Sequence, residues 1–158
     1  MKTNALKTYA LWIGLSEGVG LLAGLLTREA AAQYGAFAAK PPLSPPAILF
    51  PIVWTILYAL MGIGAARVAR TGVSRDRSHA LLLFGLQLIF NFCWSIFFFE
   101  LHAYGFAFFW LIALWTLILA MTLTFRKVDA PAAALQIPYL AWVAFAGYLN
   151  FGVWLLNR

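Results

Sequence analysis

The sequence predicts an all-α integral membrane protein, a bundle of five transmembrane helices. Hydrophobic residues make up 64% of the 158 residues and charged residues 10%, whereas in soluble domains roughly a quarter of the residues are charged. Four segments, 41–66, 78–99, 101–125 and 130–157, contain no charged residue, and each is longer than the about 20 residues that a membrane-spanning helix needs. This composition excludes a soluble enzyme, a disordered tail and a disulfide scaffold.

The fifth span is predicted at Thr8–Leu26, which only Glu17 interrupts. Lys2 and Lys7 before it also fit a secretory signal peptide, but the segment is longer than the roughly 7–15 residues of a typical signal core, so we expect a retained helix. The sequence thus predicts one domain, 1–158, with a long loop at 27–45. Its helices are expected at about 8–26, 46–66, 79–99, 104–125 and 132–156.

Basic residues are distributed unequally between the two ends of the predicted bundle, and cytoplasmic segments of membrane proteins usually carry the excess. Eight of the eleven Lys and Arg residues fall before the first helix or in the segments 67–77 and 126–130. We therefore expect a cytoplasmic N-terminus, an external C-terminus and insertion in the cytoplasmic membrane. The net charge of +6 then favours contact with anionic lipid, and no solvated basic face indicates a nucleic-acid partner.

Glycine and proline residues predict details of the helices. Pairs of glycines four residues apart in the first helix indicate close packing against a neighbouring helix or, alternatively, a dimer face. The proline-rich segment 40–46 cannot be helical. Pro51 and Pro138 are expected inside helices, and Pro51 frees a carbonyl group one turn earlier, which predicts a kink or a hydrogen bond from a neighbouring helix. The glycine pairs are Gly14 with Gly18, and Gly20 with Gly24.

Residue types that usually carry catalysis are scarce. Cys93 is the only cysteine, which excludes a disulfide within the chain and a thiolate metal cluster. His79 and His102 lie near opposite ends of one predicted helix, about 34 Å apart, and are too distant to share a metal ion. The sequence offers no Ser-His-acid set, carboxylate pair or phosphate-binding glycine loop, so we expect no metal site and no hydrolytic or phosphoryl chemistry.

Aromatic and amide side chains recur at helical spacing inside three of the predicted spans, so that each set lies on one helix face. The sets are Trp54 with Tyr58; Gln87 with Asn91 and Trp94; and Trp142 with Ala146 and Asn150. Three interpretations remain open. The amides can join helices by hydrogen bonds while the tryptophans fill the core, or the tryptophans can lie in the interfacial belt. Alternatively, these faces line an aromatic cavity that binds a flat, mostly apolar ligand.

Glu17 lies near the middle of the first span, where a carboxylate is costly in hydrocarbon. We expect it either to be protonated or to pair with an amide of the third or fifth helix. An intramembrane acid also indicates a ligand or proton site, so Glu17 is a candidate functional residue. A water-filled cavity around it is the structural alternative.

Four blocks of sequence between residues 40 and 157 carry further information. They are Lys40-Pro41 to Pro45-Pro46 with Phe50-Pro51; Val53 to Gly62; Gln87 to Asn91 with Trp94 and Phe97-Phe98; and Pro138 to Ala146 with Leu149-Asn150. In order and spacing, these blocks resemble the translocator protein family of tryptophan-rich sensory proteins. The block in the fifth helix is especially specific, whereas the first helix adds little to the resemblance.

The resemblance implies a five-helix bundle, commonly a homodimer, with a cavity covered by the first long loop. It also implies a porphyrin such as protoporphyrin IX or haem as ligand, with no cofactor required, and it allows an outer membrane as the location. Gln87 joins the candidate set because it shares a face with Asn91, and Arg28 and Lys40 in the loop could pair with propionates. Residues that match cavity positions of the family are Trp54, Tyr58, Asn91, Trp94, Trp142, Ala146, Leu149 and Asn150.

The resemblance leaves three functions open. A tetrapyrrole-binding sensor comes first. Some bacterial members promote slow light- and oxygen-dependent breakdown of bound protoporphyrin through two cavity tryptophans, which match Trp54 and Trp142 here, so a photo-oxidative enzyme comes second. A tetrapyrrole transporter comes third, because the helix number is odd and the sequence has no internal repeat.

Two departures from the family pattern bear on the ligand. Leu43 stands where the family usually has a tryptophan in the loop. Phe151 and Leu155 occupy the positions of the tyrosine and the arginine in the mammalian cholesterol motif, so we do not expect sterol binding through that motif.

Overall fold

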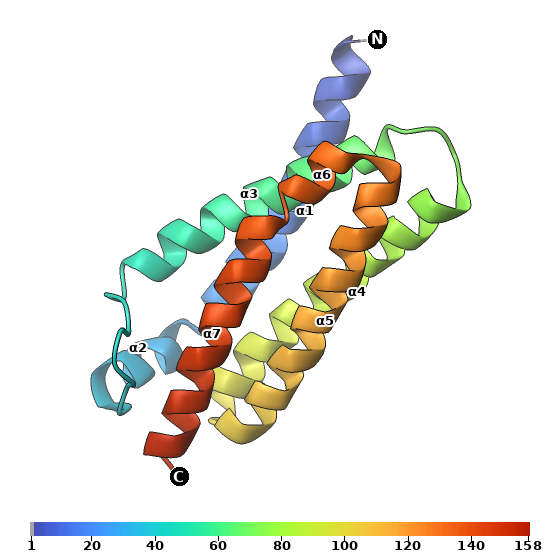
Figure 1. The fold of residues 1–158 in the computed structure, drawn as a ribbon. Helices are drawn as coiled ribbons and strands as arrows, with labels where there is room; N and C mark the ends of the chain where they lie inside the picture. The colour runs from blue at the N-terminus through green and yellow to red at the C-terminus, as the bar shows by residue number, and fades with distance from the viewer. Residues whose placement is uncertain (1) are drawn as a thin grey trace.

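The computed structural model describes residues 2–158, and Figure 1 shows its long helices running together as an elongated bundle. Five stretches are long and apolar enough to cross a membrane: residues 4–26 of α1, then α3, α4 with η1, α5, and α6 with α7. These helices confirm the predicted fold class. The two ends of the chain lie at opposite ends of the bundle (Figure 1). In chain order the elements are α1 (Lys2–Leu26), α2 (Arg28–Phe37), α3 (Leu49–Ala69), α4 (Arg75–Ser95), the π-helical turn η1 (Ile96–Glu100), α5 (Tyr104–Val128), α6 (Ala130–Ala134) and α7 (Ile137–Leu156).

Several helices extend beyond their predicted ends. α1 already begins at Lys2, whose side chain lies outside the described part of the chain, and α5 continues to Val128. α4 begins at Arg75 instead of residue 79, because the hydroxyl of Ser74 accepts a hydrogen bond from the backbone N–H of Arg77 at 3.1 Å and caps the helix. Hydropathy identifies only the part of a helix that lies in hydrocarbon, so it does not predict the polar ends of the helix.

The expected loop at 27–45 is partly wrong, because residues 28–37 form the helix α2. Its Glu-Ala-Ala-Ala-Gln segment consists of strong helix formers. The ring of Tyr34 holds this helix against η1, with edge-on contacts to Phe98 at 5.2 Å and to Phe99 at 5.6 Å between ring centroids. Burial there, with a smaller contribution from a neighbouring tyrosine on α5, raises the pKa of Tyr34 to about 12.

The two prolines expected in helix interiors lie in first turns instead. α3 begins at Leu49, two residues before Pro51, and α7 begins at Ile137, immediately before Pro138. A proline in the first turn costs no hydrogen bond, because the N–H that it lacks would have no intrahelical partner. No kink is therefore needed at Pro51, whereas the predicted helix 132–156 is interrupted just before Pro138, between α6 and α7.

The core lies between α3, α4, α5 and α7, with α5 between α4 and α7. α1 contacts chiefly α3 and remains on the outside of the bundle. Only 11% of its span is buried, and its outer face carries exposed leucines, which suits a helix surrounded by lipid. The largest buried apolar side chains include Tyr139, Phe84, Phe125, Met61, Leu114, Ile118 and Met121.

Glycines allow α1 and α3 to approach each other closely. A Cβ atom at Gly62 of α3 would lie 2.5 Å from the Cα atom of Ile13. A Cβ atom at Gly20 of α1 would overlap the ring of Tyr58. Gly20 thus makes the close helix contact that its spacing predicts. The remaining glycines of α1 face open space: Gly14, Gly18 and Gly24.

An ion pair joins α3 to the start of α6. Arg67 donates from Nε to Oδ2 of Asp129 at 2.6 Å and from Nη2 to Oδ1 at 3.1 Å. Oδ2 of Asp129 also accepts the backbone N–H of Ala132 at 3.0 Å and so caps α6. The hydrogen bonds from Arg67 hold the pKa of the Asp129 carboxyl below its ordinary value, so this clamp is fully charged at neutral pH.

Replacing Gly62 by alanine should destabilise the bundle by about 1–3 kcal/mol, because the added methyl group meets the backbone of α1, which no rotamer change can relieve. The matched control Gly24→Ala adds the same group to open space and should leave stability unchanged or slightly higher. Thermal unfolding of both variants in detergent, followed by circular dichroism, measures the difference. Equal midpoints would contradict the close approach of α1 and α3.

Candidate ligand site between α3 and α7

Five aromatic rings meet where α3 faces α7. Phe50, Trp54 and Tyr58 follow one another at intervals of four residues and therefore share a face of α3. The ring of Trp54 lies 5.5 Å from that of Tyr58 and 6.2 Å, edge-on, from that of Tyr139 on α7. Phe50 meets Trp142 of α7 edge-on at 5.9 Å. We call these five residues the aromatic seam.

A chain of hydrogen bonds lies buried beside the seam and links α3, α4 and α7. The hydroxyl of Tyr58 donates to Oδ1 of Asn91 at 2.8 Å, and Nδ2 of Asn91 donates to the hydroxyl oxygen of Tyr139 at 2.7 Å. The Tyr139 hydroxyl in turn donates to Oε1 of Gln87 at 2.7 Å. All four side chains are at most 5% exposed. We call them the polar chain.

The polar chain matches one of the interpretations that the sequence left open. Buried polar groups are costly in an apolar medium unless they form hydrogen bonds, and here the two amides and two phenols satisfy one another. Nε2 of Gln87 makes a further, weak contact with the sulfur of Met61 at 3.7 Å. Gln87 and Asn91 thus join helices, and in doing so they fix two tyrosines whose rings touch Trp54.

The other predicted site residues of α4 and α7 form a second cluster, further along both helices. Nε1 of Trp94 donates to Oδ1 of Asn150 at 3.0 Å, and Nδ2 of Asn150 donates to the backbone oxygen of Tyr104 at 2.8 Å. The indole of Trp94 also stacks on Phe98 at 5.0 Å. Leu149 is buried beside Asn150 in the chain, and Ala146, one turn before it, packs against the main core.

Glu17 lies half-buried on α1 and has no ion-pair partner among the described residues. The amides expected to pair with it bond elsewhere, Gln87 and Asn91 within the polar chain and Asn150 to Trp94 and Tyr104. Of the two alternatives, the pairing with an amide is therefore not formed, because α1 lies outside the bundle, against α3.

The segment between α2 and α3 is fastened to the C-terminal half of α7. Backbone groups of Ala39 exchange two hydrogen bonds with the side chain of Asn157, at 2.9 and 2.8 Å. The hydroxyl of Tyr148 donates to the backbone oxygen of Pro42 at 2.7 Å. Lys40 is already engaged, because its Nζ donates to the backbone oxygen of Gly35 at 2.7 Å.

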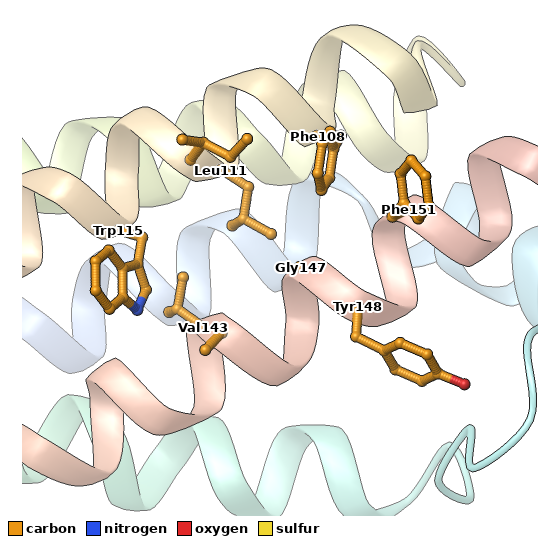
Figure 2. Close-up of a pocket in the computed structure, with 9 residues that line it drawn as sticks. Phe108, Leu111, Trp115, Val143, Gly147, Tyr148 and Phe151 are labelled. Carbon is orange, nitrogen blue, oxygen red and sulfur yellow. The ribbon is translucent and has the colours of Figure 1, made fainter.

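An apolar groove of about 370 Å³ lies on another face of α7, against α5. Figure 2 shows Phe108, Leu111 and Trp115 of α5 on one side and Val143 and Gly147 of α7 on the other. Its side chains are apolar apart from two groups that are already bonded: the indole N–H of Trp115 to Leu140 O at 3.1 Å, and the Tyr148 hydroxyl. Sequence reasoning missed this groove, because it depends on how α5 and α7 pack.

Sequence reasoning also left Phe50 and Tyr139 out of the candidate set. A usable signal was present, since Phe50 is four residues before Trp54 and Tyr139 is three before Trp142, so each shares a helix face with a candidate tryptophan. The fold and this site define a helical membrane protein with an aromatic seam held by buried amides and phenols.

Comparisons with known proteins identify the family. The model of the TspO/MBR family matches residues 12–155. The chain is 40% identical to a tryptophan-rich protein TspO of Chlorobaculum tepidum over 151 residues, 95% of this chain and 96% of that protein. It is 34% identical to a translocator protein of Bos taurus over 141 residues, 88% of this chain and 83% of the other. The protein CrtK of Rhodobacter capsulatus is 39% identical over 121 residues, 75% and 74% of the two chains. The chain therefore belongs to the TspO/MBR family.

Removing one hydroxyl should show how much the polar chain contributes to the free energy of unfolding. Tyr139→Phe leaves an amide donor of Asn91 and the Oε1 acceptor of Gln87 without partners in a buried site, and should cost about 1–3 kcal/mol per unsatisfied group. Tyr148→Phe removes an exposed hydroxyl that bonds one backbone oxygen, so about 1 kcal/mol or less is expected. Thermal unfolding in detergent compares the two variants. Equal losses would show that the polar chain does not hold the helices together.

Proposed function

We propose that this membrane protein is a sensor that binds a tetrapyrrole such as protoporphyrin IX, with the macrocycle inserted at the aromatic seam. The observation that carries the proposal is the meeting of Phe50, Trp54 and Tyr58 on α3 with Tyr139 and Trp142 on α7. A porphyrin is a broad, flat π-system, and aromatic side chains offer it offset-stacked or edge-on contacts. Family membership and the five spans agree with a ligand taken up within the membrane.

The packing around the seam supports insertion there. α3 touches α7 at few points, whereas α1 with α3, α4 with α5 and α5 with α7 form extensive interfaces. Two aromatic contacts, Phe50 with Trp142 and Trp54 with Tyr139, cross this narrow interface. A flat ligand that replaced these contacts with its own would disturb little of the rest of the core.

The indole N–H groups at the seam provide a second support. Trp94, Trp110 and Trp115 donate theirs to oxygens of the protein at 2.8–3.1 Å. Within the described chain, no acceptor bonds the N–H of Trp54 or Trp142, and neither N–H is buried without a partner. Both are therefore available to a propionate or to a pyrrole edge.

A photo-oxidative enzyme is the second candidate, favoured by the two half-buried indoles of Trp54 and Trp142 at one seam. Indole can give up an electron or react with singlet oxygen, so light and oxygen could drive slow breakdown of a bound porphyrin without a metal. A tetrapyrrole carrier is the third candidate, and uptake into proteoliposomes would distinguish it.

Assembly and orientation are part of the same proposal. We propose a homodimer, for which the outer face of α1 with Gly14 and Gly18 is available. The excess of basic residues at the end that holds the N-terminus favours a cytoplasmic N-terminus and an external C-terminus, in the cytoplasmic membrane.

Titration with protoporphyrin IX in detergent tests the site, followed by quenching of tryptophan fluorescence and a shift of the porphyrin's Soret band. Trp54→Phe and Trp142→Phe should each weaken binding about 3–10-fold, because each removes ring area and an N–H donor. Trp110→Phe is the matched control. It lies on α5, stacked on Phe90, and should leave affinity unchanged.

Loss of affinity in all three variants alike, or no binding to the unaltered protein, would contradict the proposed site. Illumination of the bound complex in air then tests the second candidate. Bleaching of the Soret band should be slower in the variant with both Trp54→Phe and Trp142→Phe, compared at equal amounts of bound porphyrin. Equal bleaching rates would exclude enzymatic breakdown.

A further inference from the structure

A second cavity, of about 500 Å³, lies at the junction of α1, α2 and the turn after η1, apart from the aromatic seam. Polar side chains and charged side chains of both signs line it, including Arg28 and Glu29 of α2, Glu100 at the end of η1, and His102 in the turn that follows. Leu25 and Leu26, at the end of the α1 span, complete its rim. We call the space bounded by these residues the headgroup pocket.

Two local features bring these side chains together. α2 turns back at Thr27 and is held against η1 by the ring of Tyr34, which contacts Phe98 and Phe99. On the other side, the π-helical turn ends at Glu100 and the chain passes through His102 with φ of 51°. Such a left-handed conformation is uncommon outside glycine, and π-helical turns recur at functional sites.

The charges around the headgroup pocket are not neutralised by one another. The ion pair found among the described residues is Arg67 with Asp129, at the other end of α3 and α5 from this pocket. Arg28, Glu29 and Glu100 therefore surround one cavity without an ion pair within 4 Å in the described chain. A ligand that carried both a negative and a positive group would pair with both kinds of side chain.

The position of the pocket indicates that the remaining part of the ligand is apolar. It opens where the spans of α1 and of α4 with η1 end, at the boundary between hydrocarbon and water. Leu25 and Leu26 are 60% and 55% exposed, and Leu21 and Leu22 continue the apolar surface along α1. This surface would lie along the acyl chains of a molecule whose polar head occupies the pocket.

We propose that the headgroup pocket binds a zwitterionic phospholipid whose headgroup ends in a primary ammonium, such as phosphatidylethanolamine. Its phosphate faces Arg28 and His102, and its ammonium donates hydrogen bonds to Glu29 and Glu100. With two carboxylates against one guanidinium, the pocket repels a lipid with only a negative headgroup. A quaternary ammonium has no N–H to donate and so fits the carboxylates less well.

Native mass spectrometry of the detergent-purified protein tests the proposal, with dioleoyl phosphatidylethanolamine, phosphatidylcholine and phosphatidylglycerol at equal concentrations. The ethanolamine lipid should form several-fold more of the one-to-one complex than either other lipid. Arg28→Gln and Glu100→Gln should each reduce this complex several-fold, and Glu100→Gln should raise the share of phosphatidylglycerol. Matched controls are Asp76→Asn in the first turn of α4 and Arg126→Gln in the last turn of α5, far from the pocket.

Equal binding of the three lipids would overturn the proposal, as would an ethanolamine complex that neither pocket variant weakens. Deacylated glycerophosphoethanolamine distinguishes the headgroup from surface adsorption of the chains, since it should compete with the ethanolamine lipid at the pocket. Failure to compete at high excess would show that only the acyl chains are held. All four substituted side chains are exposed, so unfolding midpoints should stay within about 2 °C of the unaltered protein.

Discussion

The structure depends on a buried hydrogen-bond chain that has no water to compete for it. Tyr58, Asn91, Tyr139 and Gln87 satisfy one another inside a bundle whose surroundings are hydrocarbon. Lipid tails are as apolar as the core, so apolar burial alone does not fix which helices meet. Directional bonds between an amide pair on α4 and a phenol from each of α3 and α7 specify that arrangement, and an unpaired member would be costly.

The same bonds prepare the site. Hydrogen bonds of their hydroxyls hold both tyrosines in place, so the ring of Trp54 packs against two fixed rings. The contact between Phe50 and Trp142 completes the seam. The segment between α2 and α3 is tied to α7 and its end through Tyr148 and Asn157. α3 meets α7 directly at few points, so an inserted ring system would separate the two helices at the Phe50–Trp142 end of the seam, beyond the hydrogen bonds of the polar chain.

Sequence reasoning predicted what hydropathy and helical spacing determine and missed what three-dimensional packing determines. Four charge-free segments and the apolar stretch around Glu17 predicted five spans, and the four-residue spacing placed Trp54 with Tyr58 and Gln87 with Asn91. The spacing could not show that Asn91 bonds Tyr139, because partners on different helices leave no mark in the sequence. Gly18 and Gly20 look alike in the sequence, yet only Gly20 faces a neighbouring helix. Pro138 was predicted inside a helix because hydropathy does not distinguish a proline in the first turn from one in the helix interior.

Insertion of a porphyrin at the aromatic seam, as we propose, requires α3 and α7 to separate there. Spin labels at the exposed positions Ile52 on α3 and Ala141 on α7, introduced as cysteines after Cys93→Ala, report the distance between the helices by pulsed electron resonance. Saturating protoporphyrin IX should lengthen this distance by about 3–4 Å, the thickness of one inserted ring layer. An unchanged distance distribution, under conditions where the Soret band shows full binding, would contradict insertion at the seam.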